Sequence, residues 1–131
     1  MAKIHAAKAR ALVGVRFRPQ GRDPETGLDC VGMILRACAI DSAAVRSNYA
    51  LRGDHAHELK SALGALCRRV MTAQAREGDI LLMAAGPRQM HLGIRTERGV
   101  VHADAKLRRV VETPGKPPWP VIGAYRARRA R

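Results

Sequence analysis

The sequence is poor in aromatic residues and has no long apolar stretch. Its aromatic side chains are Phe17, Tyr49, Trp119 and Tyr125, so the core of this 131-residue chain must consist mainly of aliphatic residues and methionine. No run approaches the ~20 apolar residues of a membrane-spanning helix, and we expect no integral membrane segment. Apolar residues still make up 47% of the chain, which is typical of a packed globular protein. At this length we expect a single domain over residues 1–131.

The N-terminus lacks the pattern of a secretory leader. A leader has a charged start followed by an uninterrupted apolar stretch, whereas residues 1–14 have Lys3, Lys8 and Arg10 spread through them. We therefore expect synthesis in the cytoplasm without a signal peptide. Any role outside the cytoplasm would require another route of export.

Cysteine and acidic residues are also scarce. Three cysteines cannot all pair within one chain, which excludes a disulfide scaffold and favours reduced thiols. Lys and Arg number 24 against 11 Asp and Glu, and the net charge is +13. This charge predicts salt-sensitive attraction to polyanions, without choosing among nucleic acid, acidic lipid, lipopolysaccharide and anionic wall polymers. Residues 126–131 (RARRAR) are predicted to form a flexible basic tail.

Hydrophobic periodicity and turn residues indicate helices followed by strands. Helices are expected over residues 2–13, 30–39 and 55–70, the last two capped by Asp29 and Asp54, and the Pro- and Gly-rich segment 14–29 is expected to be a loop. Strand-type segments follow at residues 79–83, 90–96, 100–104, 107–112 and 121–127. This order predicts an α+β fold in which N-terminal helices cover one side of an antiparallel sheet of about five short strands.

Cys30 is a candidate nucleophile because it lies at the start of a predicted helix. The partial positive charge of a helix N-terminus can lower a thiol pKa from ~8.5 to between ~3.5 and 7.5. Gly27 and Gly32 could leave room for a substrate backbone to approach. A small buried residue at a helix start is the alternative interpretation of Cys30. Cys38 and Cys67 lie within predicted helices beside aliphatic residues, and we expect both to belong to the core.

His91 and His102 are candidates for the base and its orienting partner. They lie on consecutive predicted strands joined by a turn near Arg98 and Gly99. A hairpin centred between Thr96 and Glu97 would pair His91 directly with His102, with Cβ atoms ~5 Å apart on one face of the sheet. A thiol nucleophile needs such a base, held by a third group. A catalytic zinc site formed by Cys30 and both histidines is an alternative, but no carboxylate base lies close by in the sequence.

Several segments together resemble the NlpC/P60 family of papain-like cysteine hydrolases. The segment LVGVRFRPQGRDPETGLDCVGMILRA (residues 12–37) resembles the family's nucleophile region, with its D-C-x-G motif before an apolar helix. GDILLM (78–83), HLGIRTERGVVHA (91–103) and AYR (124–126) resemble later blocks of the family, in the same order. The resemblance covers most of the chain and implies a papain-like α+β domain.

The resemblance also implies residue roles. Cys30 would attack the carbonyl, His91 would act as general base and His102 would orient it. Asp29 would shape a substrate pocket or hold the helix start, and no cofactor or metal is implied. Phe17 stands where the family has a substrate-side tyrosine, and Val31 replaces the serine after the nucleophile. The implied substrates are peptidoglycan stem peptides, cut between D-glutamate and diaminopimelate.

Three functions remain open at this point. The first is a cell-wall peptidase, acting at the wall or in the periplasm and delivered by a phage-like tail, a gene-transfer particle or another secretion component. The second is an amidase or acyltransferase on the same scaffold. The third is a non-enzymatic basic module that binds anionic envelope polymers or nucleic acid.

Overall fold

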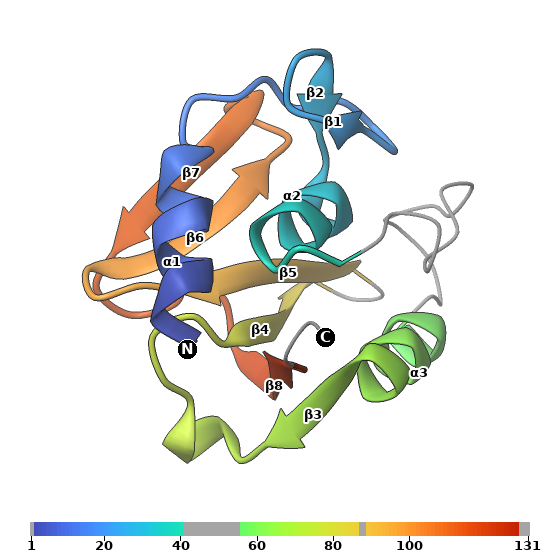
Figure 1. Cartoon of the computed structure of the whole chain (residues 1–131), viewed down its shortest axis with the longest axis vertical. Coiled ribbons are helices and arrows are strands. Elements are labelled where there is room, and N and C mark those ends of the chain that lie inside the picture. The colour runs from blue at the N-terminus through green and yellow to red at the C-terminus, as the bar shows by residue number, and fades with distance from the viewer. Residues whose placement is uncertain (1, 41–55, 87–88, 129–131) are drawn as a thin grey trace.

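The computed structural model describes residues 2–40, 56–86 and 89–128 (Figure 1). The helices are α1 (Ala2–Ala11), α2 (Cys30–Ala37) and α3 (Ala56–Leu66), with a 3-10 helix at Thr72–Gln74. The strands are β1 (Arg22–Asp23), β2 (Gly27–Leu28), β3 (Cys67–Val70), β4 (Ile80–Gly86), β5 (Gln89–Arg95), β6 (Gly99–Asp104), β7 (Arg109–Pro114) and β8 (Val121–Ala127). No helix in these ranges is long and apolar enough to cross a membrane.

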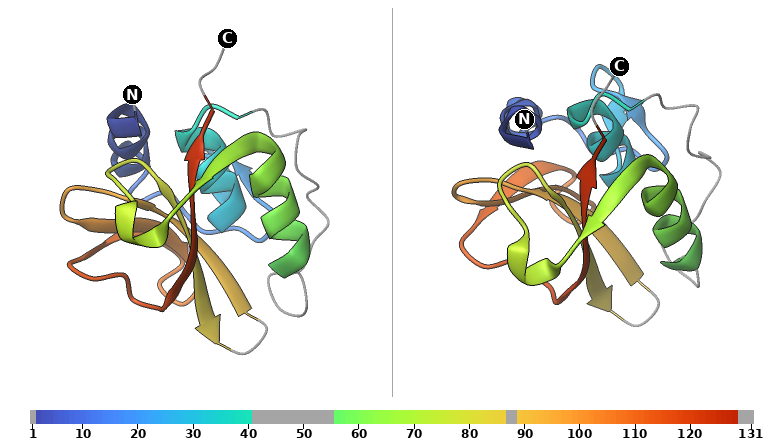
Figure 2. Two further views of the ribbon diagram at one scale, coloured as in Figure 1. Left: turned by 90° about the horizontal axis from the view of Figure 1, so that it is seen from below. Right: turned by 60° about the horizontal axis from the view of Figure 1, so that its bottom comes forward.

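Six strands form one antiparallel sheet in the order β3-β8-β4-β5-β6-β7. Its main core lies between one face of the sheet and the helices, where Ala9 of α1, Met33 of α2 and Leu63 of α3 join Leu92 and Ile94 of β5. Figure 2 shows α1 and α2 on the same side of the sheet. The opposite face has a smaller apolar cluster. The predicted α+β class, with helices on one side of an antiparallel sheet, is confirmed.

Several details of the predicted secondary structure are wrong. The third helix ends at Leu66, and Cys67–Val70 forms the edge strand β3, paired with β8. This sheet pairing outweighs the helical periodicity of the segment, since propensity is a weak prior that tertiary contacts override. The sheet accordingly has six strands instead of about five. The predicted loop 14–29 contains the small β1–β2 hairpin, and the predicted cap Asp54 lies outside the described residues.

The start of α2 is held by Asp29, as predicted. Asp29 Oδ1 accepts a hydrogen bond of 2.7 Å from the backbone N–H of Gly32, and Asp29 Oδ2 accepts one of 3.0 Å from that of Gln20. Gly32 is needed here because a Cβ at this position would lie 2.0 Å from the carbonyl oxygen of Gly21. The space beside Gly32 is therefore filled by the protein's own loop and not by a substrate backbone.

The basic segment 126–131 is not a flexible tail at its beginning. Arg126 and Ala127 belong to β8, and the Arg126 guanidinium binds the buried carboxylate of Asp79 through two hydrogen bonds of 2.9 and 2.8 Å. Residues 129–131 lie outside the part of the chain that is described. The strand extends to Ala127 through its pairing with β3.

Candidate active site

Cys30 is the first residue of α2, and its side chain is completely buried. Burial, followed by the negative charge of Asp29, raises the pKa of the Cys30 thiol to about 12. The expectation of a lowered pKa is therefore wrong for this structure. Both causes disfavour the thiolate, and together they outweigh hydrogen bonding from backbone groups, including that of Leu92, which acts in the opposite direction.

The thiol lies where the pairing of β5 with β6 ends. The register of these strands includes Gly93 opposite His102 and stops there, so Leu92 has no partner on β6. The side chain of Cys30 accepts a hydrogen bond from the backbone of Leu92, which pairs with Leu82 of β4 and directly follows His91. In the described segments no hydrogen bond joins Cys30 and His91. That His91 acts as the base for the Cys30 thiol stays a prediction.

His91 and His102 lie on one face of the sheet, but not directly opposite each other. His102 pairs with Gly93, so the hairpin is displaced by two residues from the predicted register. Side chains alternate with a period of two along a strand, and a displacement of two keeps both histidines on the same face. His91 Nε2 and His102 Nδ1 are 3.1 Å apart, within hydrogen-bonding distance.

Thr113 extends this pair into a chain of three polar side chains. His102 Nε2 lies 2.8 Å from Thr113 Oγ1 on β7. If His91 carries its proton on Nε2, it donates to His102 Nδ1, and His102 in turn donates from Nε2 to Thr113. This arrangement leaves Nδ1 of His91 as a proton acceptor, as a general base requires. The reverse arrangement places a proton on Nδ1 and removes its basic lone pair.

Trp119 packs against both histidines. Its ring meets those of His91 and His102 edge to face, with centroid distances of 4.9 and 5.4 Å. Burial, followed by the proximity of His102, lowers the pKa of His91 to about 4, and burial also lowers that of His102. At neutral pH His91 is therefore uncharged and able to accept a proton.

The two predicted substrate residues differ in their surroundings. Asp29 is fully buried and its carboxylate oxygens bind backbone N–H groups, so its observed contacts are those of a helix cap. Phe17 is half-buried, packs against the main core and forms a parallel bridge with Leu28. Their contacts with substrate stay predictions.

Sequence reasoning missed Thr113 and Trp119. Thr113 follows the predicted strand 107–112, and the real strand extends to Pro114. Correct strand ends would have placed it two positions beyond Val111, the partner of His102, and hence on the histidine face. Trp119 lies before β8 in a segment that carries no strand pattern, although it is the single tryptophan of the chain.

We expect the native Cys30 thiol to react slowly with iodoacetamide at pH 7. A thiol with a pKa of about 12 has a thiolate fraction on the order of 10³-fold below that of free cysteine, and alkylation should accelerate as the pH rises. Peptide mass spectrometry would follow each cysteine, with Cys38 and Cys67 as buried internal comparisons. Rapid labelling of Cys30 alone near neutrality would contradict a protonated thiol.

The fold is similar to that of several solved NlpC/P60 domains. The NlpC/P60 domain of the peptidoglycan hydrolase SagA is 17% identical over 95% of this chain and 97% of that one, with a TM-score of 0.63. The P60 domain of an antigen from M. avium subspecies paratuberculosis is 19% identical over 96% of this chain and 93% of its own, with a TM-score of 0.60.

The peptidoglycan hydrolase RipB from Mycobacterium tuberculosis shows the same likeness. It is 20% identical over 95% of this chain, which spans 63% of RipB, with a TM-score of 0.61. No family model and no curated protein sequence matches the chain. The similarity therefore lies in the path of the backbone, and the chain has the fold of the NlpC/P60 domains.

Proposed function

We propose that the protein is a cysteine peptidase that hydrolyses amide bonds in peptidoglycan stem peptides, at the bond between D-glutamate and diaminopimelate. The observation that carries the proposal is the chain His91–His102–Thr113, in a fold where the helix-start Cys30 accepts a hydrogen bond from the backbone of Leu92, the residue after His91. Two of the similar structures are peptidoglycan hydrolases, which supports this substrate class. The site of action would be the cell wall.

The reaction would start from a neutral thiol and a neutral imidazole. Cys30 Sγ attacks the amide carbonyl carbon while its proton passes to Nδ1 of His91. The backbone N–H groups at the start of α2 face the developing oxyanion. The His91 imidazolium then protonates the departing amine, leaving an acyl-thioester on Cys30. Water, deprotonated by His91, hydrolyses the thioester to the free acid and restores the thiol.

His102 and Thr113 would act through His91. With His91 protonated on Nε2, His102 Nδ1 accepts a hydrogen bond from it, and His102 Nε2–H donates one to Thr113 Oγ1. This fixes both the tautomer and the orientation of the base, which is the task of the third member in such sites. We assign both residues a positioning role.

The burial of Cys30 favours a second candidate function. A thiol with no exposed surface and a raised pKa is typical of a structural cysteine, and Phe17 provides no hydroxyl. Together with the net charge of +13, this suits a basic module that binds wall polymer without cutting it.

Digestion of purified peptidoglycan, followed by mass spectrometry of the soluble products, distinguishes these functions. The peptidase should release fragments with a new free amino group on diaminopimelate. Release of intact stem peptides from the glycan would instead indicate an amidase. If the protein stays on the wall but releases no more soluble product than a control without protein, the binding module would be established.

A further inference from the structure

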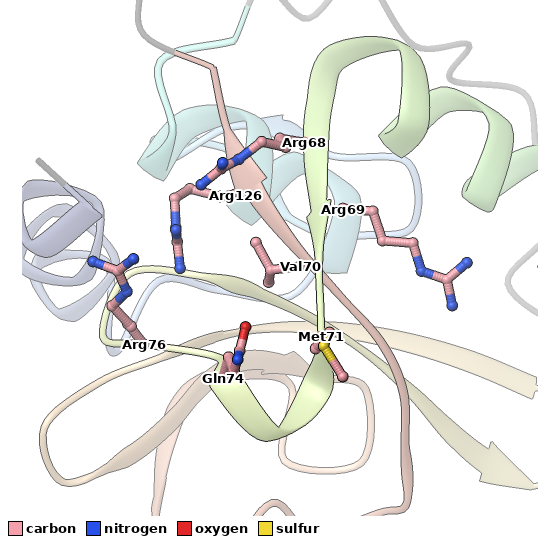
Figure 3. A pocket seen from close by; sticks show the side chains of 7 residues that line it. All are labelled: Arg68, Arg69, Val70, Met71, Gln74, Arg76 and Arg126. Atoms are coloured by element: carbon pink, nitrogen blue, oxygen red, sulfur yellow. The ribbon is translucent and has the colours of Figure 1, made fainter.

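A cavity of about 620 Å³ lies away from the proposed catalytic residues, between β3, the 3-10 helix and the end of β8. This volume is within the usual range for small-molecule sites, ~300 to 1,000 Å³. Its lining is dominated by arginine, and the residues are Arg68, Arg69, Val70, Met71, Gln74, Arg76 and Arg126. Figure 3 shows Arg68 and Arg126 side by side, Arg76 across the cavity and the guanidinium of Arg69 pointing away from them.

Arg68 and Arg126 are direct partners across the antiparallel pair β3–β8. Like charges at directly opposed positions destabilise a sheet. Asp79 relieves this repulsion in part, because it binds the Arg126 guanidinium and also accepts a 2.8 Å hydrogen bond from the backbone N–H of Arg76. Asp79 is fully buried, and its two hydrogen bonds orient the Arg126 guanidinium.

The positive charge of the arginines in this cavity exceeds the negative charge of their acidic partner, Asp79. Within the described residues Arg68 and Arg76 form no salt bridge, and the single carboxylate of Asp79 is already engaged by Arg126. Arg68 and Arg76 are both exposed. An anion placed between the guanidinium groups would gain two partners and would remove the repulsion between the opposed arginines.

We propose that this cavity binds a phosphate group of a phosphodiester-linked polyol or saccharide polymer. Guanidinium groups bind phosphate through paired, charge-assisted hydrogen bonds. The amide of Gln74 provides both a donor and an acceptor for a neighbouring hydroxyl group. Val70 and the highly exposed Met71 provide apolar contacts for the carbon backbone of the polymer, since 67% of the Met71 surface is exposed.

The lining disfavours nucleic acid as the ligand. Binding of single strands relies on aromatic side chains on which successive bases stack, and none of the described residues that line this cavity is aromatic. The proposal is independent of catalysis, because neither Cys30 nor His91 belongs to the cavity.

Isothermal titration with a synthetic glycerol phosphate hexamer tests the proposal without any amide bond to cut. We expect saturable binding that weakens as salt rises, and a loss of affinity of about 10-fold or more in Arg68→Gln and in Arg76→Gln. The hexamer should also raise the melting temperature of the parent protein. Arg68→Gln should itself melt no lower than the parent, so that weaker binding cannot reflect unfolding.

Arg109→Gln is the matched control, because it removes the same charge from an exposed strand arginine that does not line the cavity. Arg36→Gln on α2 is the distant control. Both should change affinity by less than about 3-fold, as expected of screened surface charges. An equal loss in all four variants would overturn a specific site in favour of general electrostatics. Tighter binding of a DNA hexanucleotide, or of anionic lipid vesicles, than of the glycerol phosphate hexamer would overturn the ligand assignment.

Discussion

Replacing Cys30 by Ala is expected to abolish the release of peptide fragments from peptidoglycan, with a loss on the order of 10⁴-fold or more. The sulfur forms the bond to the carbonyl carbon in the proposed mechanism, and no other group can replace it. Cys30→Ser should be equally inactive, because a buried hydroxyl is a far weaker nucleophile without a stronger base. Quantitative mass spectrometry of digests would measure the loss.

Variants of the histidine chain should show graded effects. His91→Ala removes the general base and should lower kcat/KM by ~10² to 10⁴-fold. His102→Ala should retain part of the activity, because it removes only the group that holds His91. Thr113→Val, which keeps the shape of the side chain, should have the smallest effect. Activity should persist under acid conditions until His91 is protonated near its pKa of about 4.

Controls separate these effects from unfolding and from metal chemistry. Circular dichroism melting should show Cys30→Ala to be folded at the assay temperature. EDTA should leave the activity of the parent unchanged, since the proposed mechanism uses only the thiol and the imidazole. Unchanged cleavage by Cys30→Ala, or its arrest by EDTA, would refute the thiol mechanism.

Replacing Arg126 by Ala is expected to cause the largest loss of stability among surface-accessible arginines. It would leave the buried Asp79 carboxylate without its charged partner. Breaking a buried ion pair from one side costs ~3 to 5 kcal/mol. The Arg126 side chain is 17% exposed and the backbone N–H of Arg76 remains bound, so we expect about 2 to 3 kcal/mol.

Thermal or urea unfolding would measure this loss, which corresponds to a melting temperature lower by roughly 10 °C. Arg68→Ala is the matched control, because Arg68 lies directly opposite Arg126 and has no acidic partner among the described residues. Its removal relieves a repulsion and should leave stability unchanged or slightly higher. Equal destabilisation by the two substitutions would show that the Asp79 pair contributes nothing specific.

The relative placement of His91 and His102 shows how far local sequence can predict a site. Alternation along the strands was enough to place both side chains on one face. The actual register differs by two residues, because the hairpin is centred between Glu97 and Arg98 and not between Thr96 and Glu97. An error of two preserves the face, whereas an error of one would have placed the histidines on opposite faces. The predicted contact between the two histidines is therefore present, although the predicted strand register is wrong.

The ionisation of Cys30 could not be predicted in this way. The helix start and its Asp29 cap follow from local sequence, and both are present in the structure. The pKa of the thiol depends on how completely other segments cover it, and the structure buries it entirely. Solvation is a property of the whole fold. A helix start lowers the pKa of an exposed thiol, but the pKa of the buried Cys30 thiol is raised.

The sequence by itself determined the α+β class, the start of α2 with its cap and the sheet face shared by the two histidines. These features depend on side-chain periodicity and on interactions between residues close in the chain. Only the tertiary structure decided that Cys67–Val70 is a strand, that Thr113 supports His102 and that Arg68, Arg76 and Arg126 surround one cavity. Each of these depends on contacts between segments far apart in sequence, whose register and burial no local pattern specifies.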